Sequence, residues 1–194
     1  MKTLVILAAG SALCLTACKR YDSNNNMAAD NGVVMNDMTD ANMSANGMAP
    51  AALPTTAQAF ADAAASSDKF EIESSNLAAT SAQSASVKSF AKQMVTAHTG
   101  TTAKLKSALS GMSPAMTAND SLNAEQQAML DGLKGKTGAD FDAAYKDAQV
   151  TAHQKTLDAL NSYSANGDNA TLQGLAKGMI PTVTAHLNLA KGLK

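Results

Sequence analysis

The sequence is short of aromatic residues and carries no excess of charge of either sign. Only 4% of its 194 residues are aromatic and none is Trp, whereas Ala, Leu and Met supply most of the apolar content. Because Ala is the strongest helix former and strands favour aromatic and β-branched residues, this composition predicts an all-α protein. The formal net charge of -1 offers no strongly basic face, which argues against nucleic acid as a partner.

Cysteine is also scarce, and its two copies, Cys14 and Cys18, both lie near the amino terminus. Lys2 and the apolar run that follows it are typical of a signal peptide, and the run is too short to cross a bilayer as a helix. The phrase Leu15-Thr16-Ala17-Cys18 resembles the lipobox of bacterial lipoproteins. This resemblance implies that residues 1–17 are a lipoprotein signal peptide, that Cys18 is lipidated, and that no disulfide forms in the mature protein.

The lipobox resemblance also implies a cellular address. Several acyl chains on one residue hold a protein firmly at a membrane, since a single chain binds only marginally. In lipoproteins of this type an Asp directly after the lipidated residue often means retention at the inner membrane, and this chain has Lys19 there. We therefore expect an outer-membrane lipoprotein that faces the periplasm and contacts the membrane through its lipid anchor. Whether it has a protein partner, the sequence does not tell.

Residues 18–56 are predicted to form a disordered tether that begins at the lipidated Cys. The segment is rich in Asn, Asp, Ala, Met and Gly, and it lacks the large apolar residues that offset the entropy of ordering. Its methionines carry soft thioethers that could hold Cu(I), but the composition favours a low-complexity spacer in which Met happens to be common. These methionines are Met27, Met35, Met38, Met43 and Met48.

Residues 57–194 are predicted to fold as a bundle of four long helices. Apolar or small residues recur there at intervals of three, four and seven, and a short helix at 122–133, capped by Asp120 or Ser121, is expected in the middle connection. This connectivity is that of a ferritin-like four-helix bundle with a long crossover containing a short extra helix. The long helices are expected at 57–83, 86–110, 137–163 and 170–193.

Histidine occurs three times, each time at the end of the same phrase, Val-Thr-Ala-His. His98, His153 and His186 fall on the second, third and fourth long helices. Counting 1.5 Å of rise per residue from the turns places His98 near the level of Glu71 on the first helix, and His153 near that level too. By the same count His186 lies roughly 9 Å further along the axis. Glu71, His98 and His153 are therefore predicted neighbours, with His186 a weaker fourth.

Four blocks of the chain resemble a ferritin-like family of bacterial envelope proteins known as domain of unknown function 4142. The resemblance covers about residues 57–193, and it implies the bundle fold and the envelope address rather than an activity. One departure is that the family often has Asp before its first two histidines, where this chain has Ala97 and Ala152. The four blocks are Glu71-Ile-Glu-Ser-Ser-Asn-Leu-Ala, Met94-Val-Thr-Ala-His, Gly138-Ala-Asp-Phe-Asp-Ala-Ala-Tyr and Pro181-Thr-Val-Thr-Ala-His-Leu.

The ferritin-like connectivity raises the question of a metal site. A di-iron centre needs Glu from two helices and Glu-x-x-His from the other two, but the predicted second and fourth helices contain no Asp or Glu, so that centre is excluded. A single-metal site remains possible, because Glu71, His98, His153 and His186 offer a carboxylate and three imidazoles that suit Zn, Cu or Fe. The alternative is a structural network of hydrogen-bonded core histidines paired with Glu71, and acid–base catalysis is a third interpretation.

These alternatives lead to two hypotheses of function. The favoured one is a non-enzymatic envelope lipoprotein with a structural or envelope-stress role and no resident cofactor. The second is a mononuclear metal-binding protein or small oxidoreductase that uses the core His and Glu residues.

Overall fold

The computed structural model of the chain describes residues 52–194, which form five helices and no β-sheet. The predicted all-α, ferritin-like bundle with a short extra helix in its crossover is confirmed. The predictions for the signal peptide, for Cys18 and for most of the tether concern residues 1–51, which lie outside the described residues. No helix within residues 52–194 is both long and apolar enough to cross a membrane. The helices are α1 (Ala57–Ser81), α2 (Ala85–Ser110), α3 (Ala124–Leu133), α4 (Gly138–Asn166) and α5 (Ala170–Lys191).

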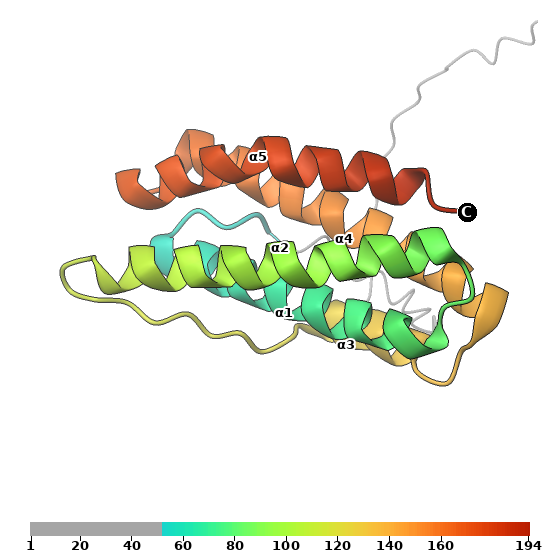
Figure 1. The fold of residues 1–194 in the computed structure, drawn as a ribbon. Coiled ribbons are helices and arrows are strands. Elements are labelled where there is room, and N and C mark those ends of the chain that lie inside the picture. The colour runs from blue at the N-terminus through green and yellow to red at the C-terminus, as the bar shows by residue number, and fades with distance from the viewer. Residues whose placement is uncertain (1–51) are drawn as a thin grey trace, which may run out of the picture. The chain divides into compact units, whose positions relative to one another are not determined.

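The four long helices form two antiparallel hairpins, one of α1 and α2 and one of α4 and α5 (Figure 1). A crossover that contains α3 joins the hairpins, and α3 packs against the outside of α1 and α4. Around the bundle, α1 contacts α2 and α4, and α5 contacts α4 and α2. Each long helix therefore has two long neighbours and turns one face to the common centre.

A capping side chain marks the start of α1, α3 and α5. Thr56 accepts a hydrogen bond from the backbone N–H of Ala59 at the start of α1, and Asn169 caps α5 in the same way. At α3 the expected cap, Asp120 or Ser121, is wrong. Asn123 caps this helix instead and exchanges reciprocal side-chain and backbone hydrogen bonds with Gln126. This capping box satisfies two backbone donors that a helix end otherwise leaves open.

The core contains two apolar clusters. The first surrounds Phe90 and Phe141, where the beginnings of α2 and α4 meet α3, and the second surrounds Phe60 and Tyr163. Phe60 and Tyr163 stack with ring centroids 4.2 Å apart and an interplanar angle of 11°. We call these the Phe90 cluster and the Phe60 cluster.

Between the two clusters lies a buried central polar layer. Along α2, for example, Met94 belongs to the Phe90 cluster, Leu105 belongs to the Phe60 cluster, and His98 lies between them. Every long helix contributes to this layer, which is the only part of the described core that is built mainly from polar groups. Its buried members include Asp68, Glu71, Ser74, Ser75, His98, Gln149, His153 and His186.

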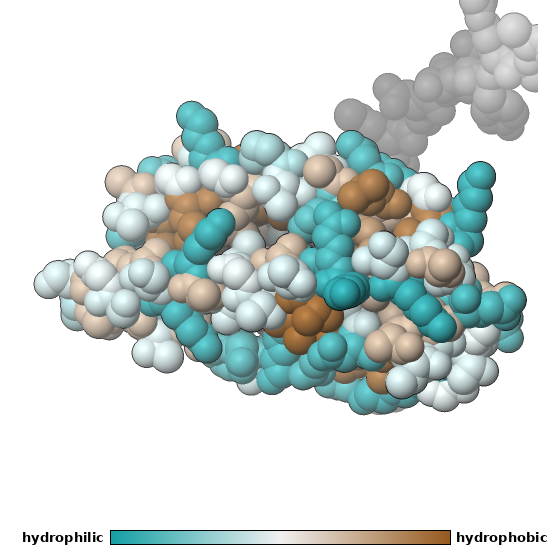
Figure 2. Space-filling model, in the orientation of Figure 1, coloured by the Kyte–Doolittle hydropathy of each residue, from teal (hydrophilic) through white to brown (hydrophobic). Residues whose placement is uncertain are grey.

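The exterior is mostly hydrophilic or made of small residues. On the face drawn in Figure 2, apolar residues occur only in small groups between polar ones. Leu53 and Leu189, at 48% and 49%, are the exposed large apolar residues within residues 52–194.

Candidate metal centre

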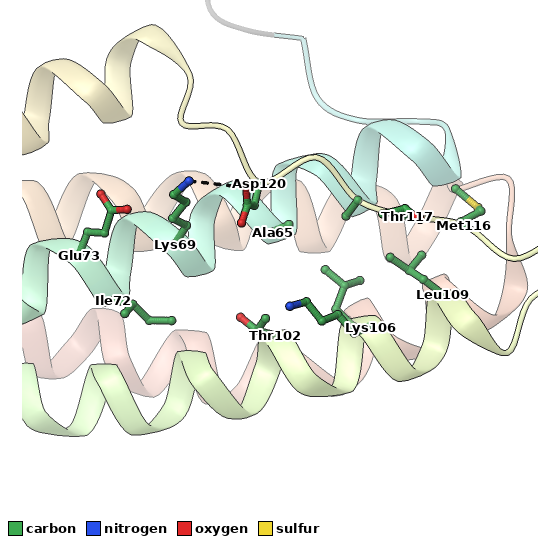
Figure 3. Close-up of a pocket in the computed structure, with 12 residues that line it drawn as sticks. Ala65, Lys69, Ile72, Glu73, Thr102, Lys106, Leu109, Met116, Thr117 and Asp120 are labelled. Atoms are coloured by element: carbon green, nitrogen blue, oxygen red, sulfur yellow. Dashed lines mark ion pairs between the residues drawn. The ribbon is translucent and has the colours of Figure 1, made fainter.

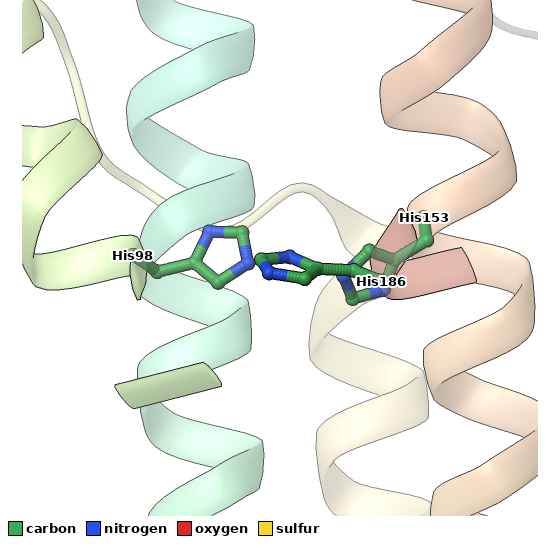
Figure 4. Close-up of side chains that lie close together, drawn as sticks. All are labelled: His98, His153 and His186. Atoms are coloured by element: carbon green, nitrogen blue, oxygen red, sulfur yellow. The ribbon is translucent and has the colours of Figure 1, made fainter. Parts of the chain in front are cut away.

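The three histidines meet in the central polar layer. They come from α2, α4 and α5, and the exposed fractions of His98, His153 and His186 are 4%, 1% and 5%. Their ring centroids are 5.6–5.8 Å apart. One ring nitrogen from each histidine lies within 4.8 Å of the other two, and Figure 4 shows the imidazoles converging on one space. Histidines that are distant in sequence thus form one compact group.

The predicted displacement of His186 along the bundle axis is wrong. Side chains on an α-helix lean toward the amino terminus of their own helix. Because α4 and α5 run antiparallel, His153 and His186 lean toward each other. A count along backbone positions omits this leaning, and it therefore placed His186 too far away.

His98 is oriented by a buried carboxylate on α1. Its Nδ1 lies 2.8 Å from Oδ1 of Asp68, and Asp68 itself is only 3% exposed. The hydroxyls of Thr101 and Thr102 donate to the two oxygens of the same carboxylate, at 2.7 and 3.0 Å. Since an ionised carboxylate only accepts hydrogen bonds, Nδ1 of His98 carries a hydrogen. Neutral His98 then has its lone pair at Nε2.

His153 is oriented by the main chain of its own helix. Its Nδ1 lies 2.9 Å from the backbone oxygen of Gln149, and a carbonyl oxygen accepts but cannot donate, so Nδ1 again carries the hydrogen. Oε1 of Glu71 is also near, 3.4 Å from the same Nδ1. The hydrogen bond to Gln149 is the shorter contact, and it fixes the ring with Nε2 as the acceptor.

The ring nitrogens left over have no partner. Nε2 of His98, Nε2 of His153 and Nδ1 of His186 are buried and make no hydrogen bond within the described part of the chain. Buried polar groups are almost always hydrogen-bonded, because leaving one unpaired is costly. Three clustered histidines, each with a buried ring nitrogen that has no partner among residues 52–194, offer a set of ligands for a cation.

Glu71 lies beside this group but is not part of it. The carboxyl is 1% exposed, and neither oxygen has a hydrogen-bond partner among residues 52–194. Its Oε1 lies 3.4 Å from Nδ1 of His153, whereas His98 is hydrogen-bonded to Asp68 instead. The structure thus brings all four residues of the predicted metal set into one layer. The histidines form the compact group, and a role for any of the four in binding metal stays a prediction.

Burial dominates the protonation of the site. It raises the pKa of Glu71 from an ordinary 4.5 to about 7, against the opposing effect of His98. Burial, assisted by His98, lowers the pKa of His153 to about 3 and that of His186 to about 4. For His98, burial favours the neutral form, but Asp68 and Glu71 outweigh it and raise the pKa. At neutral pH, therefore, His153 and His186 are uncharged and hold lone pairs.

Asp68 is the site residue that the sequence reasoning missed. It lies four residues after Ala64 and three before Glu71, so it continues the inward stripe of α1 on which Glu71 had been placed. That spacing could have identified it. The prediction overlooked Asp68 because a charged residue on a helix is usually exposed.

A separate cavity of about 440 Å³ opens between α1, α2 and the crossover. Lys69, which is paired with Asp120 at 3.5 Å, lies at its wall (Figure 3). Apolar residues such as Leu105 and Leu109 also line the cavity, as does Thr102, whose hydroxyl reaches Asp68. None of the three histidines lines this cavity.

Fold and site together define an all-α bundle with a buried centre of three histidines. The chain belongs to the family described as domain of unknown function (DUF4142), whose model matches residues 42–193. This match confirms the resemblance found from the sequence blocks. No curated protein matches the chain.

Solved structures of the protein CopM share the fold. CopM in the Cu(II)-bound form is 16% identical, with a TM-score of 0.60 over 71% of this chain and 94% of CopM. The Cu(I)-bound form is 16% identical, with a TM-score of 0.59 over 72% and 95% of the two chains. The Ag-bound form is 15% identical, with a TM-score of 0.57 over the same shares. At this identity the likeness concerns the fold.

Proposed function

We propose that the protein binds a single copper ion between His98, His153 and His186. The observation that supports this most directly is the convergence of three buried histidines, each of which places one ring nitrogen within 4.8 Å of the other two. Imidazole is a good ligand for copper, and among divalent first-row ions Cu(II) binds most strongly to a given site of nitrogen ligands. The copper-bound and silver-bound forms of CopM, which has the same fold, add support for a metal of this group.

Burial favours holding an ion over catalysis. Each imidazole is at most 5% exposed, so an ion between the rings is shielded from bulk water and from a dissolved substrate. The carboxyl of Glu71 supplies negative charge beside the ion when it is ionised. Binding and release of copper is accordingly the proposed activity, in preference to an oxidoreductase reaction.

Copper titration of the full-length protein tests this proposal. We expect one tightly held equivalent, measured by elemental analysis after dialysis against a weak chelator. The triple variant His98→Ala/His153→Ala/His186→Ala should lose it. Asp158→Ala, which removes an exposed carboxylate from α4, is the matched control and should keep it. Copper retained in full by the folded triple variant would refute the histidine site and would point to the methionines of residues 18–56.

We also propose that the domain acts at the bacterial outer membrane, on the periplasmic side, through a lipid on Cys18. The phrase Leu15-Thr16-Ala17-Cys18 supports this, and a copper-binding bundle on a tether would meet incoming metal in that compartment. Metabolic labelling with a fatty acid is the test. Cys18→Ser should abolish labelling and release or mis-process the protein, whereas Cys14→Ser should leave labelling intact. Unchanged membrane retention of Cys18→Ser would contradict the lipid anchor.

A further inference from the structure

We infer that Asp68 is the positioning residue of the centre: it holds His98 in the tautomer and ring orientation that direct Nε2 toward His153 and His186. The orientation is a property of the metal-free protein. Its consequence for metal affinity rests on the copper site proposed above.

The contacts of Asp68 account for this role. Its Oδ1 accepts a hydrogen bond from Nδ1 of His98 at 2.8 Å. The hydroxyls of Thr101 and Thr102, on the next turn of α2, donate to the two carboxylate oxygens. The same two hydroxyls lie 3.0 and 2.9 Å from the backbone oxygen of His98. The carboxylate is therefore clamped to the turn that carries His98, and the ring can rotate only by breaking these contacts.

Asp68 is placed to orient the ring but not to hold an ion. It contacts Nδ1, whereas an ion between the three histidines would lie at Nε2, on the other side of the imidazole. Its oxygens are not part of the group of donor atoms that lie within 4.8 Å of one another. A carboxylate that accepts the second N–H of a ligating histidine fixes the tautomer and raises the basicity of the ligand.

The three histidines differ in how firmly they are held. His153 is fixed by a backbone carbonyl, which no substitution removes, and Nδ1 of His186 has no partner in the described residues. Among residues 52–194, Asp68 is thus the one side chain that accepts a hydrogen bond from any of the three imidazoles, and its replacement leaves all three in place.

The first measurement is the tautomer of His98 in metal-free, full-length protein. Nitrogen chemical shifts of the imidazoles, recorded by NMR at alkaline pH where the rings are neutral, distinguish a protonated Nδ1 from a protonated Nε2. We expect wild-type His98 to be protonated at Nδ1. Asp68→Ala should convert it to a mixture with the Nε2–H form, and Asp68→Asn should restore much of the original state because its amide oxygen still accepts. Asp158→Ala should have no effect.

The second measurement is copper affinity of the same variants by competition with a chelator. Loss of an orienting partner typically weakens metal binding about 10–100-fold. We expect that range for Asp68→Ala, a smaller loss for Asp68→Asn and none for Asp158→Ala. If Asp68→Ala does not fold, Thr102→Val, which removes one donor to Asp68 at nearly constant volume, should shift the tautomer and the affinity in the same direction by less.

The outcomes separate this inference from the copper proposal. If wild-type protein binds no copper, the copper proposal fails, and the tautomer of His98 in Asp68→Ala still decides whether Asp68 orients the ring. If copper binds and Asp68→Ala changes neither the tautomer nor the affinity, the inference is overturned while the copper site stands. A loss of stability without any change of tautomer would also overturn it, because that is the signature of a residue that only supports the fold.

Discussion

The two ends of the bundle and its middle bury different kinds of side chain. In the Phe60 cluster, Phe60 and Tyr163 stack face to face, and the hydroxyl of Tyr163 reaches Asp168. In the central polar layer, by contrast, the histidine rings lie tilted or edge-on to one another, and one nitrogen of each has no hydrogen-bond partner within the described part of the chain. The ends contain satisfied or apolar groups, whereas the middle contains polar atoms that residues 52–194 leave without a hydrogen-bond partner.

This difference separates stability from function along the axis of the molecule. Apolar burial contributes roughly 25 cal/mol per Å², so the two apolar clusters supply most of the driving force for folding. The middle layer lowers that total, because unpaired polar atoms and a buried carboxyl are unfavourable in an apolar environment. We conclude that the bundle tolerates its central layer because the clusters on either side keep the helices in register.

The largest effect should come from the apolar end. Phe60→Ala removes a ring that is 1% exposed and leaves Tyr163 without its stacking partner, which should lower the free energy of unfolding by about 3–5 kcal/mol. Copper affinity of the folded fraction should stay unchanged, because the histidines are held from other positions. Chemical denaturation and copper competition measure the two quantities. A large loss of copper affinity in the folded Phe60→Ala variant would show that the apolar end and the histidine layer are not independent.

The carboxyl of Glu71 should make stability fall as the pH rises. Its pKa is about 7 in the folded protein, above the ordinary 4.5, so its protonated form favours folding. That contribution is complete below 4.5 and is lost as the pH rises through about 7. The difference converts to roughly 3 kcal/mol at alkaline pH.

Glu71→Gln removes this titration. The variant should be more stable than wild type at alkaline pH, by up to roughly 3 kcal/mol, and nearly equal to it in acid. Urea denaturation of the metal-free protein at several pH values is the measurement. A variant that is less stable than wild type at alkaline pH would show that the ionised Glu71 has a stabilising partner.

Acid should act on the histidines in the opposite direction. The pKa of His153 is lowered from an ordinary 6.5 to about 3. Between these two values, His153 binds a proton in the unfolded chain but not in the folded protein. One such proton reduces the free energy of unfolding by about 1.4 kcal/mol per pH unit.

His153→Gln removes that proton uptake. Between pH 6.5 and 4.5, the free energy of unfolding of the variant should fall with decreasing pH less steeply than that of its parent, by about 1.4 kcal/mol per pH unit. Denaturation with the Glu71→Gln background as parent isolates the effect, because the carboxyl titrates in the same window. An unchanged slope would mean that His153 is protonated within the fold.

The sequence was sufficient for the fold and for the identity of the histidines. Apolar residues at helical spacing over long segments predicted the four long helices to within a few residues of their ends, since only a helix buries such a stripe. The repeated Val-Thr-Ala-His phrase singled out His98, His153 and His186. Asp120, Ser121 and Asn123 are all good caps, but among them only Asn123 has a Gln three residues later, and the prediction of the α3 cap overlooked this capping box.

The sequence was insufficient for the contacts between these residues. Both carboxylates lie on the same inward stripe of α1. Which of them, Glu71 or Asp68, contacts His98 depends on side-chain direction and on how α1 packs against α2. The proximity of His186 depends on the opposite leaning of side chains on antiparallel helices. Spacing in one chain determines which face a residue occupies, but contacts across helices require the packed structure.

The smallest effect should come from Glu73, two residues from Glu71 on α1. Two positions along a helix place a side chain on a different face, and Glu73 is partly exposed at the wall of the outer cavity (Figure 3). Glu73→Gln makes the same chemical change as Glu71→Gln, but water can solvate the Glu73 carboxylate. At the alkaline pH where Glu71→Gln should stabilise the fold by up to roughly 3 kcal/mol, Glu73→Gln should alter the free energy of unfolding by less than about 0.5 kcal/mol. Urea denaturation of the two variants side by side gives the comparison. Equal effects would mean that burial does not destabilise the ionised Glu71 carboxylate. The contrast between the buried polar layer and the exposed surface would then be refuted at Glu71, where it should be largest.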